Sequence, residues 1–260
     1  MEFRSEFGYE LIAVVPYAYW LHTKNRLHRT TSTKDTECLY YFSPDHIELE
    51  VDRKWDEDCL QKYPNKAVHV KHLKTSKWLP PPYKQIYANE RYRWEKPLCI
   101  IGNKYTEEWK GPPINFLSVE LLEQIIDLLQ DKYQIIYNRP YNHITEDDQM
   151  SVDFGDYEMI RNDYPDVIFL DELFKDNEDP STFNKIQFEI HANCDHFISV
   201  QGGGSVLSSY FGGTNLILAK RGYELNCNSY SNWYDKFAGT RIRHTNSNEK
   251  LLKFIRNEFL

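Results

Sequence analysis

The sequence predicts an α/β protein with a parallel, doubly wound sheet in its C-terminal part. Short apolar strands alternate with helical segments after residue 96, as they do in such a sheet. One unit is especially clear: an apolar run at 197–200 meets three glycines and Ser205, and a second strand follows at 215–219. We interpret it as strand, tight turn, helix and parallel strand. At 260 residues with 41% hydrophobic residues, the chain is large enough for a substantial core.

The first 96 residues show a less regular pattern. An apolar segment at 11–21 predicts a first core helix, and a polar stretch at 30–36 follows it. Apolar runs at 38–42 and 67–70 predict strands, and the charged segment 52–58 predicts a solvated helix or loop.

A change of composition at residues 78–96 predicts a connection between two lobes. Three consecutive prolines, Pro80 to Pro82, are incompatible with a helix, and the next residues are aromatic and basic. We therefore divide the chain into a lobe at 1–96 and a second lobe at 97–260. The alternative is an ordinary long loop on one domain.

The second lobe begins with a buried strand and continues in regular alternation. Ser118 precedes apolar residues at helical spacing and therefore predicts a helix N-cap. The expected strands are 98–102, 133–137 and 167–170, and the expected helices are 118–130, 181–193 and 248–260.

Polar residues follow each of these strands. Because ligands of open parallel sheets sit outside the carboxyl ends of the strands, these residues form a candidate site. Lys104 and Arg139 could neutralise a diphosphate, Arg139 in bidentate fashion. The set comprises Asn103, Lys104, Asn138, Arg139, Asp171, Glu172, Gln201, Gly202, Gly203, Gly204 and Ser205.

The glycine-rich turn predicts an anion site. Backbone N–H groups and the helix dipole favour negative charge at a helix N-terminus, and glycines let a ligand approach the backbone. Ser205 is expected at the N-cap. The alternative is a turn used only for close helix–sheet packing.

Other motifs are missing or weak. The glycine pattern is not G-x-G-x-x-G, and neither a P-loop nor a G-x-S-x-G elbow occurs. A net charge of −8 disfavours nucleic-acid binding. The apolar segment 11–21 is too short to span a membrane.

The five cysteines are widely spaced, without a C-x-x-C pair or zinc spacing, which favours free thiols in a cytoplasmic protein without a bound metal. Acidic residues 56–58 are interpreted as a solvated face rather than a metal site.

The pattern Asp195-x-x-Ile-Ser-x-x-Gly-Gly-Gly-Ser205, with Gly-Gly-Thr-Asn-Leu-Ile-Leu at 212–218, resembles glycosyltransferases of the GT-B type. The resemblance is best over residues 97–224, where heptosyltransferase-like and fucosyltransferase-like enzymes cradle a donor diphosphate. It implies two Rossmann-like lobes, the N-terminal one reduced and on the acceptor side, and the C-terminal one binding a nucleotide-sugar. It also implies metal-independent transfer from a UDP-sugar or GDP-sugar to a glycan hydroxyl, without a further cofactor.

The opening Gly8-Tyr-Glu10-Leu, with Pro16 downstream, is similar to the start of heptosyltransferases. The acid that serves as base in that family maps onto Glu10. One residue more separates glycine and acid here, so Glu6 is the substitute. The alternative for Glu10 is a favourable acid in the first turn of a helix.

The expected function is therefore a glycosyltransferase, with Asp171 or Glu172 near the ribose or base of the donor. In its compact size the chain resembles transferases encoded by bacterial surface-glycan loci and by large algal viruses. One such viral group is associated with xylose transfer. A viral enzyme would act in the host cytoplasm. The competing hypotheses are a non-catalytic nucleotide- or glycan-binding protein of the same fold and a Rossmann-type oxidoreductase or epimerase.

Overall fold

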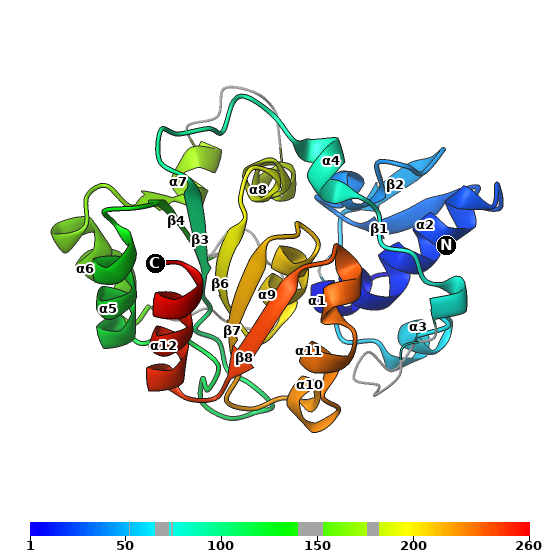
Figure 1. The fold of residues 1–260 in the computed structure, drawn as a ribbon. Helices are drawn as coiled ribbons and strands as arrows, with labels where there is room; N and C mark the ends of the chain where they lie inside the picture. Colours follow the sequence, from blue (N-terminus) through cyan, green and yellow to red (C-terminus); the bar gives the residue numbers. More distant parts are fainter. Residues whose placement is uncertain (52, 66–72, 74, 140–152, 176–181) are drawn as a thin grey trace.

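A parallel six-stranded sheet forms the centre of the computed structural model (Figure 1), which describes residues 1–51, 53–65, 73, 75–139, 153–175 and 182–260. The strand order is β5-β4-β3-β6-β7-β8, and all neighbours are parallel. The strands are β3 (Leu98–Gly102), β4 (Gln134–Asn138), β5 (Ile168–Phe169), β6 (His196–Val200), β7 (Thr214–Leu218) and β8 (Arg241–Thr245).

The strand order reverses between β3 and β6. From β3 the chain moves outward to β4 and β5, returns to pair β6 with β3, and then moves outward in the opposite direction. The loops after β3 and β6 therefore leave the sheet toward different sides. Doubly wound sheets bind their ligands in the crevice at such a point.

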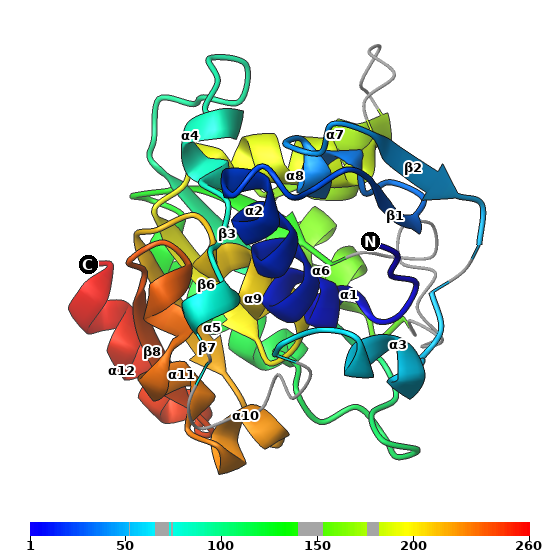
Figure 2. The ribbon, with the colours of Figure 1, turned by 90° about the vertical axis from the view of Figure 1, so that its right-hand side faces the viewer.

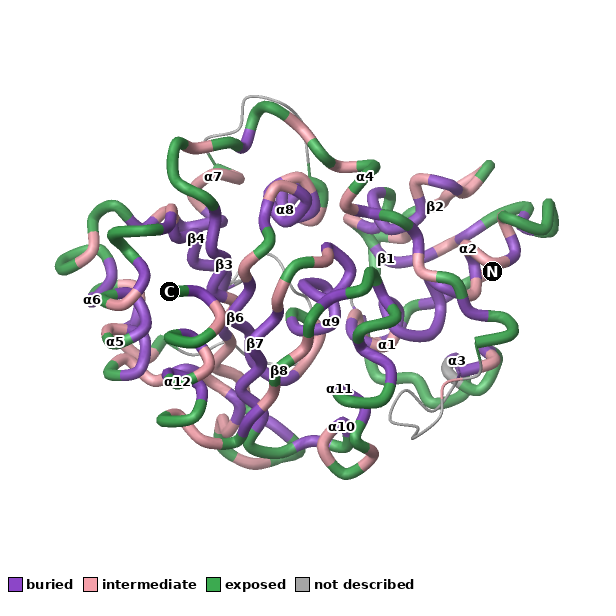
Figure 3. The backbone as a smooth tube through the Cα atoms, viewed as in Figure 1, coloured by how far each residue is buried: buried purple, intermediate pink, exposed green. Residues whose placement is uncertain are grey.

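Helices cover both faces of the sheet, so its strands are apolar on both sides. In β3, Cys99 and Ile101 join a core with α5 (Val119–Leu129), α6 (Asp156–Asp163) and α12 (Asn248–Glu258). Ile100 points to the opposite core, which contains α8 (Phe183–Ala192) and α9 (Gly203–Ser209). Figure 3 shows the central strands as mostly buried.

The N-terminal part packs on the α8/α9 side of the sheet, as Figure 1 shows. Leu11 and Tyr83 share one apolar core with Phe188 and Tyr210. The boundary at residue 96/97 stays a prediction, because this core runs across it. The elements here are α1 (Phe7–Tyr9), the π-helical turn η1 (Glu10–Val14), α2 (Val15–Thr23), β1 (Thr30–Thr33), the 3-10 turn η2 (Glu37–Tyr40), β2 (His46–Leu49), α3 (Glu57–Gln61), the 3-10 turn η3 (Thr75–Lys77) and α4 (Tyr83–Tyr87).

The predicted α/β fold with a parallel sheet is confirmed, and the expected strands match β3 to β7 within a few residues. One expectation in the first lobe is wrong. The run 38–42 forms η2 instead of a strand, while the polar stretch at 30–36 contains β1, which pairs with β2. The expected strand at 67–70 lies outside the described residues. The connection at 78–96 contains the short helix α4.

Further elements in the second part were not predicted. They are α6, α7 (Leu170–Lys175), α10 (Tyr223–Asn226), α11 (Ser229–Asn232), the 3-10 turn η4 (Tyr234–Phe237) and β8.

Candidate functional site

The glycine-rich turn lies at the carboxyl end of β6, where the strand order reverses. Gly202 is the N-cap residue of α9 and has a φ of 128°, a value that favours glycine. Gly204 is exposed, and a β-carbon on it would meet open space. The predicted N-cap role of Ser205 is wrong: this residue lies inside α9, is buried, and its hydroxyl donates to the Gly202 carbonyl at 2.8 Å. The helix starts three residues earlier than expected, with Gly202 as its N-cap, which explains the difference.

The N-terminal segment packs directly against this turn. A β-carbon on Gly8 would come within 3.4 Å of the Gly203 Cα atom, so the two backbones touch. The same β-carbon would lie 3.7 Å from a carboxylate oxygen of Glu6, a half-buried residue. Glu6 is therefore brought next to the turn from a distant part of the sequence.

Lys104, which follows β3, also lies beside the turn. Its ammonium group is 2.6 Å from a Glu108 carboxylate oxygen and donates to the Gln201 side-chain oxygen at 3.2 Å. The same ammonium would be 3.2 Å from a β-carbon on Gly202. Lys104 and Gln201 thus meet the turn as predicted from their positions at strand ends.

An amide–carboxylate network that the sequence did not reveal supports this arrangement. The Asn115 amide donates to Glu108 at 2.6 Å and to the Arg221 carbonyl at 2.9 Å. The Gln201 amide donates to Glu224 at 3.0 Å. These residues come from the loops after β3, β6 and β7, which are too far apart in the chain for a spacing signal.

Two buried tyrosines, Tyr230 and Tyr234, lie near Ser205. Burial raises the pKa of both phenols well above the ordinary value, and Glu224 adds to both increases. The Ser205 hydroxyl is close enough to offset part of this rise. Neither phenol makes a hydrogen bond of ordinary geometry with the described residues. Both phenols therefore remain protonated at neutral pH.

Arg139 does not join the site. Its guanidinium Nε lies 2.7 Å from Asp156, and the two side chains are 1% and 0% exposed. The rings of Phe154 and Tyr157 lie 5.2 and 5.0 Å from the guanidinium. Asp156 also accepts a 2.5 Å hydrogen bond from the Tyr137 hydroxyl. This placement removes the reason to expect Arg139 at a diphosphate.

The two asparagines of the predicted set stabilise loops and helices instead. The Asn103 side chain makes hydrogen bonds with both the N–H and the carbonyl of Leu117, at 2.9 and 3.1 Å. It therefore anchors the end of the loop that follows β3. Asn138 donates to the Gln187 side chain of α8 at 2.6 Å.

The predicted acidic pair lies in the first turn of α7, at the outer strand β5. Asp171 is buried and lies 3.4 Å from the Lys175 ammonium, while Glu172 is 2.6 Å from Arg161. Strand β5 is separated from β3 by β4, so the pair does not reach the glycine-rich turn.

Of the two candidate bases, Glu10 is enclosed. It is fully buried, pairs with Arg53 at 2.6 Å, and accepts hydrogen bonds from Ser32 and Tyr40 at 2.5 and 2.7 Å. These contacts give Glu10 a role in holding the N-terminal segment together. Glu6 is the carboxylate that lies at the turn.

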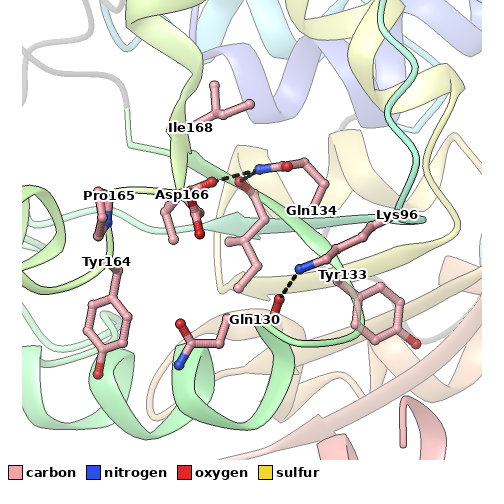
Figure 4. A pocket seen from close by; sticks show the side chains of 10 residues that line it. Lys96, Gln130, Tyr133, Gln134, Tyr164, Pro165, Asp166 and Ile168 are labelled. Carbon is pink, nitrogen blue, oxygen red and sulfur yellow. Dashed lines mark hydrogen bonds between the residues drawn. The ribbon is translucent and has the colours of Figure 1, made fainter.

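A separate pocket of about 360 Å³ lies at the opposite, amino-terminal edge of the sheet (Figure 4). Its walls include Lys96 before β3, Gln134 at the start of β4 and Tyr164 before β5. The Lys96 ammonium donates to the Gln130 carbonyl at 2.8 Å, and Gln134 donates to the Asp166 carbonyl at 2.8 Å. This pocket includes none of the predicted site residues.

Within the described residues, no group of three or more His, Cys, Asp or Glu side chains is arranged to hold a metal ion. No helix among them has the length and apolar character needed to cross a bilayer. No protein family model matches the chain, and no curated protein or solved structure resembles it at a significant level.

Proposed function

We propose that the chain binds a nucleoside-diphosphate sugar at the glycine-rich turn and transfers the sugar to a hydroxyl of a glycan. The observation that supports this proposal best is the position of the turn. Gly202 to Gly204 lie where the strand order reverses, with Gly204 open to solvent. Nucleotides bind to doubly wound sheets at this position.

In the proposed reaction, the backbone at Gly202–Gly204 and the Lys104 ammonium hold the diphosphate. The acceptor oxygen attacks the anomeric carbon and forms the new glycosidic bond. The bond from that carbon to the diphosphate oxygen breaks, and its electron pair leaves with the nucleoside diphosphate. Lys104 stabilises the charge that develops on this leaving group.

Glu6 is the proposed general base in this reaction. Its carboxylate accepts the proton of the acceptor hydroxyl as that oxygen attacks. Its place beside Gly8, which packs on the turn, supports this role, since it brings the carboxylate from the first part of the chain to the donor side. Arg139, Asn138, Asp171, Glu172 and Glu10 are not part of the proposed site.

The second candidate is a glycan- or nucleotide-binding protein that catalyses no transfer. The ion pair between Lys104 and Glu108 favours this candidate, because a cation that already pairs with a carboxylate stabilises the negative charge of a leaving diphosphate less. This candidate predicts binding that is unaffected by the Glu6→Gln substitution and no turnover in either protein.

The proposal is tested by calorimetric titration with UDP, GDP, ADP and CMP, each with and without a chelator. We expect one base to be preferred and the affinity to be insensitive to the chelator. Lys104→Ala should weaken binding, whereas Lys185→Ala, an exposed cation on α8, should not. Failure of all nucleoside diphosphates to bind would overturn the proposal.

A further inference from the structure

Two large aromatic side chains are exposed next to the candidate site. Trp55 precedes α3 and is 56% exposed, and Tyr223 begins α10 and is 58% exposed. The ring of Tyr9 in α1 packs edge-on against Trp55, with centroids 5.2 Å apart, and Tyr223 follows Gly222, where a β-carbon would lie 3.2 Å from the Gln201 side chain beside the glycine-rich turn. Figure 2 shows α1 with α3 and α10 below it on one side of the molecule.

These exposed rings are not simply scattered over the surface. Trp109 is the other aromatic residue of comparable exposure in the described part of the chain, and the Arg221 guanidinium covers its ring at 5.0 Å. Trp55 and Tyr223 thus present aromatic surface to solvent, Trp55 beside Tyr9 and Tyr223 beside the glycine-rich turn. Clustered apolar groups of this kind mark binding surfaces, because exposing them to water is unfavourable.

Two accessible carboxylates lie near the same aromatic residues. Glu6 is half-buried and lies beside Gly8, the residue before Tyr9, and Glu57 is exposed in α3, two residues after Trp55; both add to the rise in the pKa of Tyr9 that burial causes. The surface therefore combines aromatic faces with hydrogen-bond acceptors and a negative potential. The net charge of −8 reinforces that potential.

We propose that Tyr9, Trp55 and Tyr223, together with Glu6 and Glu57, bind an uncharged sugar ring of the acceptor glycan. The C–H face of a sugar packs on an aromatic ring, and its hydroxyls donate hydrogen bonds to carboxylates. An anionic sugar offers fewer donors per ring and is repelled by the two carboxylates. The role as acceptor rests on the proposed function, but binding of the sugar is measurable without it.

Tryptophan fluorescence titrations of the whole chain, without nucleotide, test this inference. The probes are two neutral oligosaccharides, xylohexaose and cellohexaose, and the anionic hexagalacturonate. We expect saturable binding of at least one neutral probe and binding at least about tenfold weaker for hexagalacturonate. Binding of hexagalacturonate as tight as that of the neutral probes would overturn the inference, as would no binding of either neutral probe.

Two variants test whether the named rings form the surface. Trp55→Ala and Tyr223→Ala should each weaken binding of the neutral probe about tenfold, which corresponds to about 1.4 kcal/mol, because each removes an aromatic ring on which the sugar stacks. Saturation-transfer NMR follows binding after Trp55 is removed. Tyr164→Ala, at the opposite edge of the sheet, is the control and should not change the affinity. Unchanged affinity in both site variants would overturn the inference.

The two proposals fail separately. If no nucleoside diphosphate binds while the neutral probe binds through Trp55, the transferase proposal is wrong and the sugar surface stands. If a nucleoside diphosphate binds and the sugar titrations fail, the reverse holds.

Discussion

The ends of β3 and β4 each place a cation against a carboxylate, but the two pairs differ in their surroundings. Arg139 and Asp156 lie 2.7 Å apart with side chains 1% and 0% exposed, between aromatic rings. Lys104 and Glu108 lie 2.6 Å apart with side chains 26% and 5% exposed, so the cation of this pair reaches solvent. The end of β4 is covered by α6, which carries Asp156. The end of β3 lies where the strand order reverses and stays accessible. A polar residue after a strand is thus a site candidate only where the topology leaves that end open.

The largest expected difference between the two pairs is in stability. Arg139→Met leaves Asp156 as a buried carboxylate without its cation and should lower the free energy of unfolding by about 3–5 kcal/mol. Lys104→Met should cost less, about 1–2 kcal/mol, because Glu108, although only 5% exposed, keeps the 2.6 Å hydrogen bond from the Asn115 amide. Urea denaturation measures both values. Equal losses would mean that the two strand ends do not differ as described.

The next effect concerns the two glutamates of the N-terminal segment. Glu6→Gln removes the proposed base and should lower the rate of sugar transfer about 100-fold or more, with unchanged nucleotide affinity. Glu10→Gln should instead lower stability, because Arg53 loses its buried partner. Release of nucleoside diphosphate and thermal unfolding distinguish the two. A Glu6→Gln protein with the original rate would exclude Glu6 as the base.

A smaller difference between Lys104 and Arg139 is expected in nucleotide binding. Lys104→Ala should weaken binding of the preferred nucleoside diphosphate about tenfold, or about 1.4 kcal/mol. Arg139→Met, titrated under conditions in which it is folded, should bind as the original chain does. Isothermal calorimetry measures both. If Arg139→Met weakens binding and Lys104→Ala does not, the assignment of the two strand ends is reversed.

The smallest effect is expected at the turn itself. Gly204→Ala should change stability by about 0.5 kcal/mol or less, because its β-carbon would meet open space. The same methyl group would stand where the diphosphate approaches, so nucleotide affinity should fall severalfold. Calorimetry and urea denaturation of one preparation give both numbers. Unchanged affinity would place the diphosphate away from this residue.

The strands that could be predicted are those whose burial shows in the sequence. The continuous apolar run at 98–102 matches β3, because a strand covered on both faces has no polar alternation. Ser118 was predicted as an N-cap, and its hydroxyl accepts from the Leu121 N–H at 3.4 Å. In these cases the residues of the element itself were enough to predict it.

Strand β1 could not be predicted, because it consists of Thr30, Thr31, Ser32 and Thr33, all of them polar. Their burial depends on partners from other segments: Thr30 donates to Ser43 at 2.8 Å, and Ser32 donates to Glu10. The run at 38–42 is too short for its apolar character to distinguish a strand from a turn of helix.

The rule that ligands bind at the carboxyl ends of the strands identified Lys104, Gln201 and the glycines of the candidate site. It also selected residues whose side chains have partners elsewhere in the protein. Arg139 pairs with Asp156, which lies 17 residues further along the chain, and no spacing pattern in the sequence predicts this pair. Asn115 and Glu224 meet the site only through loops whose paths the sequence does not specify.

The π-helical turn η1 leads to a last consequence. Its Leu11 carbonyl accepts from the Tyr210 hydroxyl that follows α9, and its Ile12 carbonyl accepts from the Trp78 indole at 2.7 Å. These bonds, with the backbone contact of Gly8 and Gly203, fasten the start of the chain to the helix that follows the glycines. Capture of a substrate by hinged closure of two halves would have to break them. The protein should therefore keep one overall shape whether empty or loaded, and adjust to its substrates through side chains at the rim.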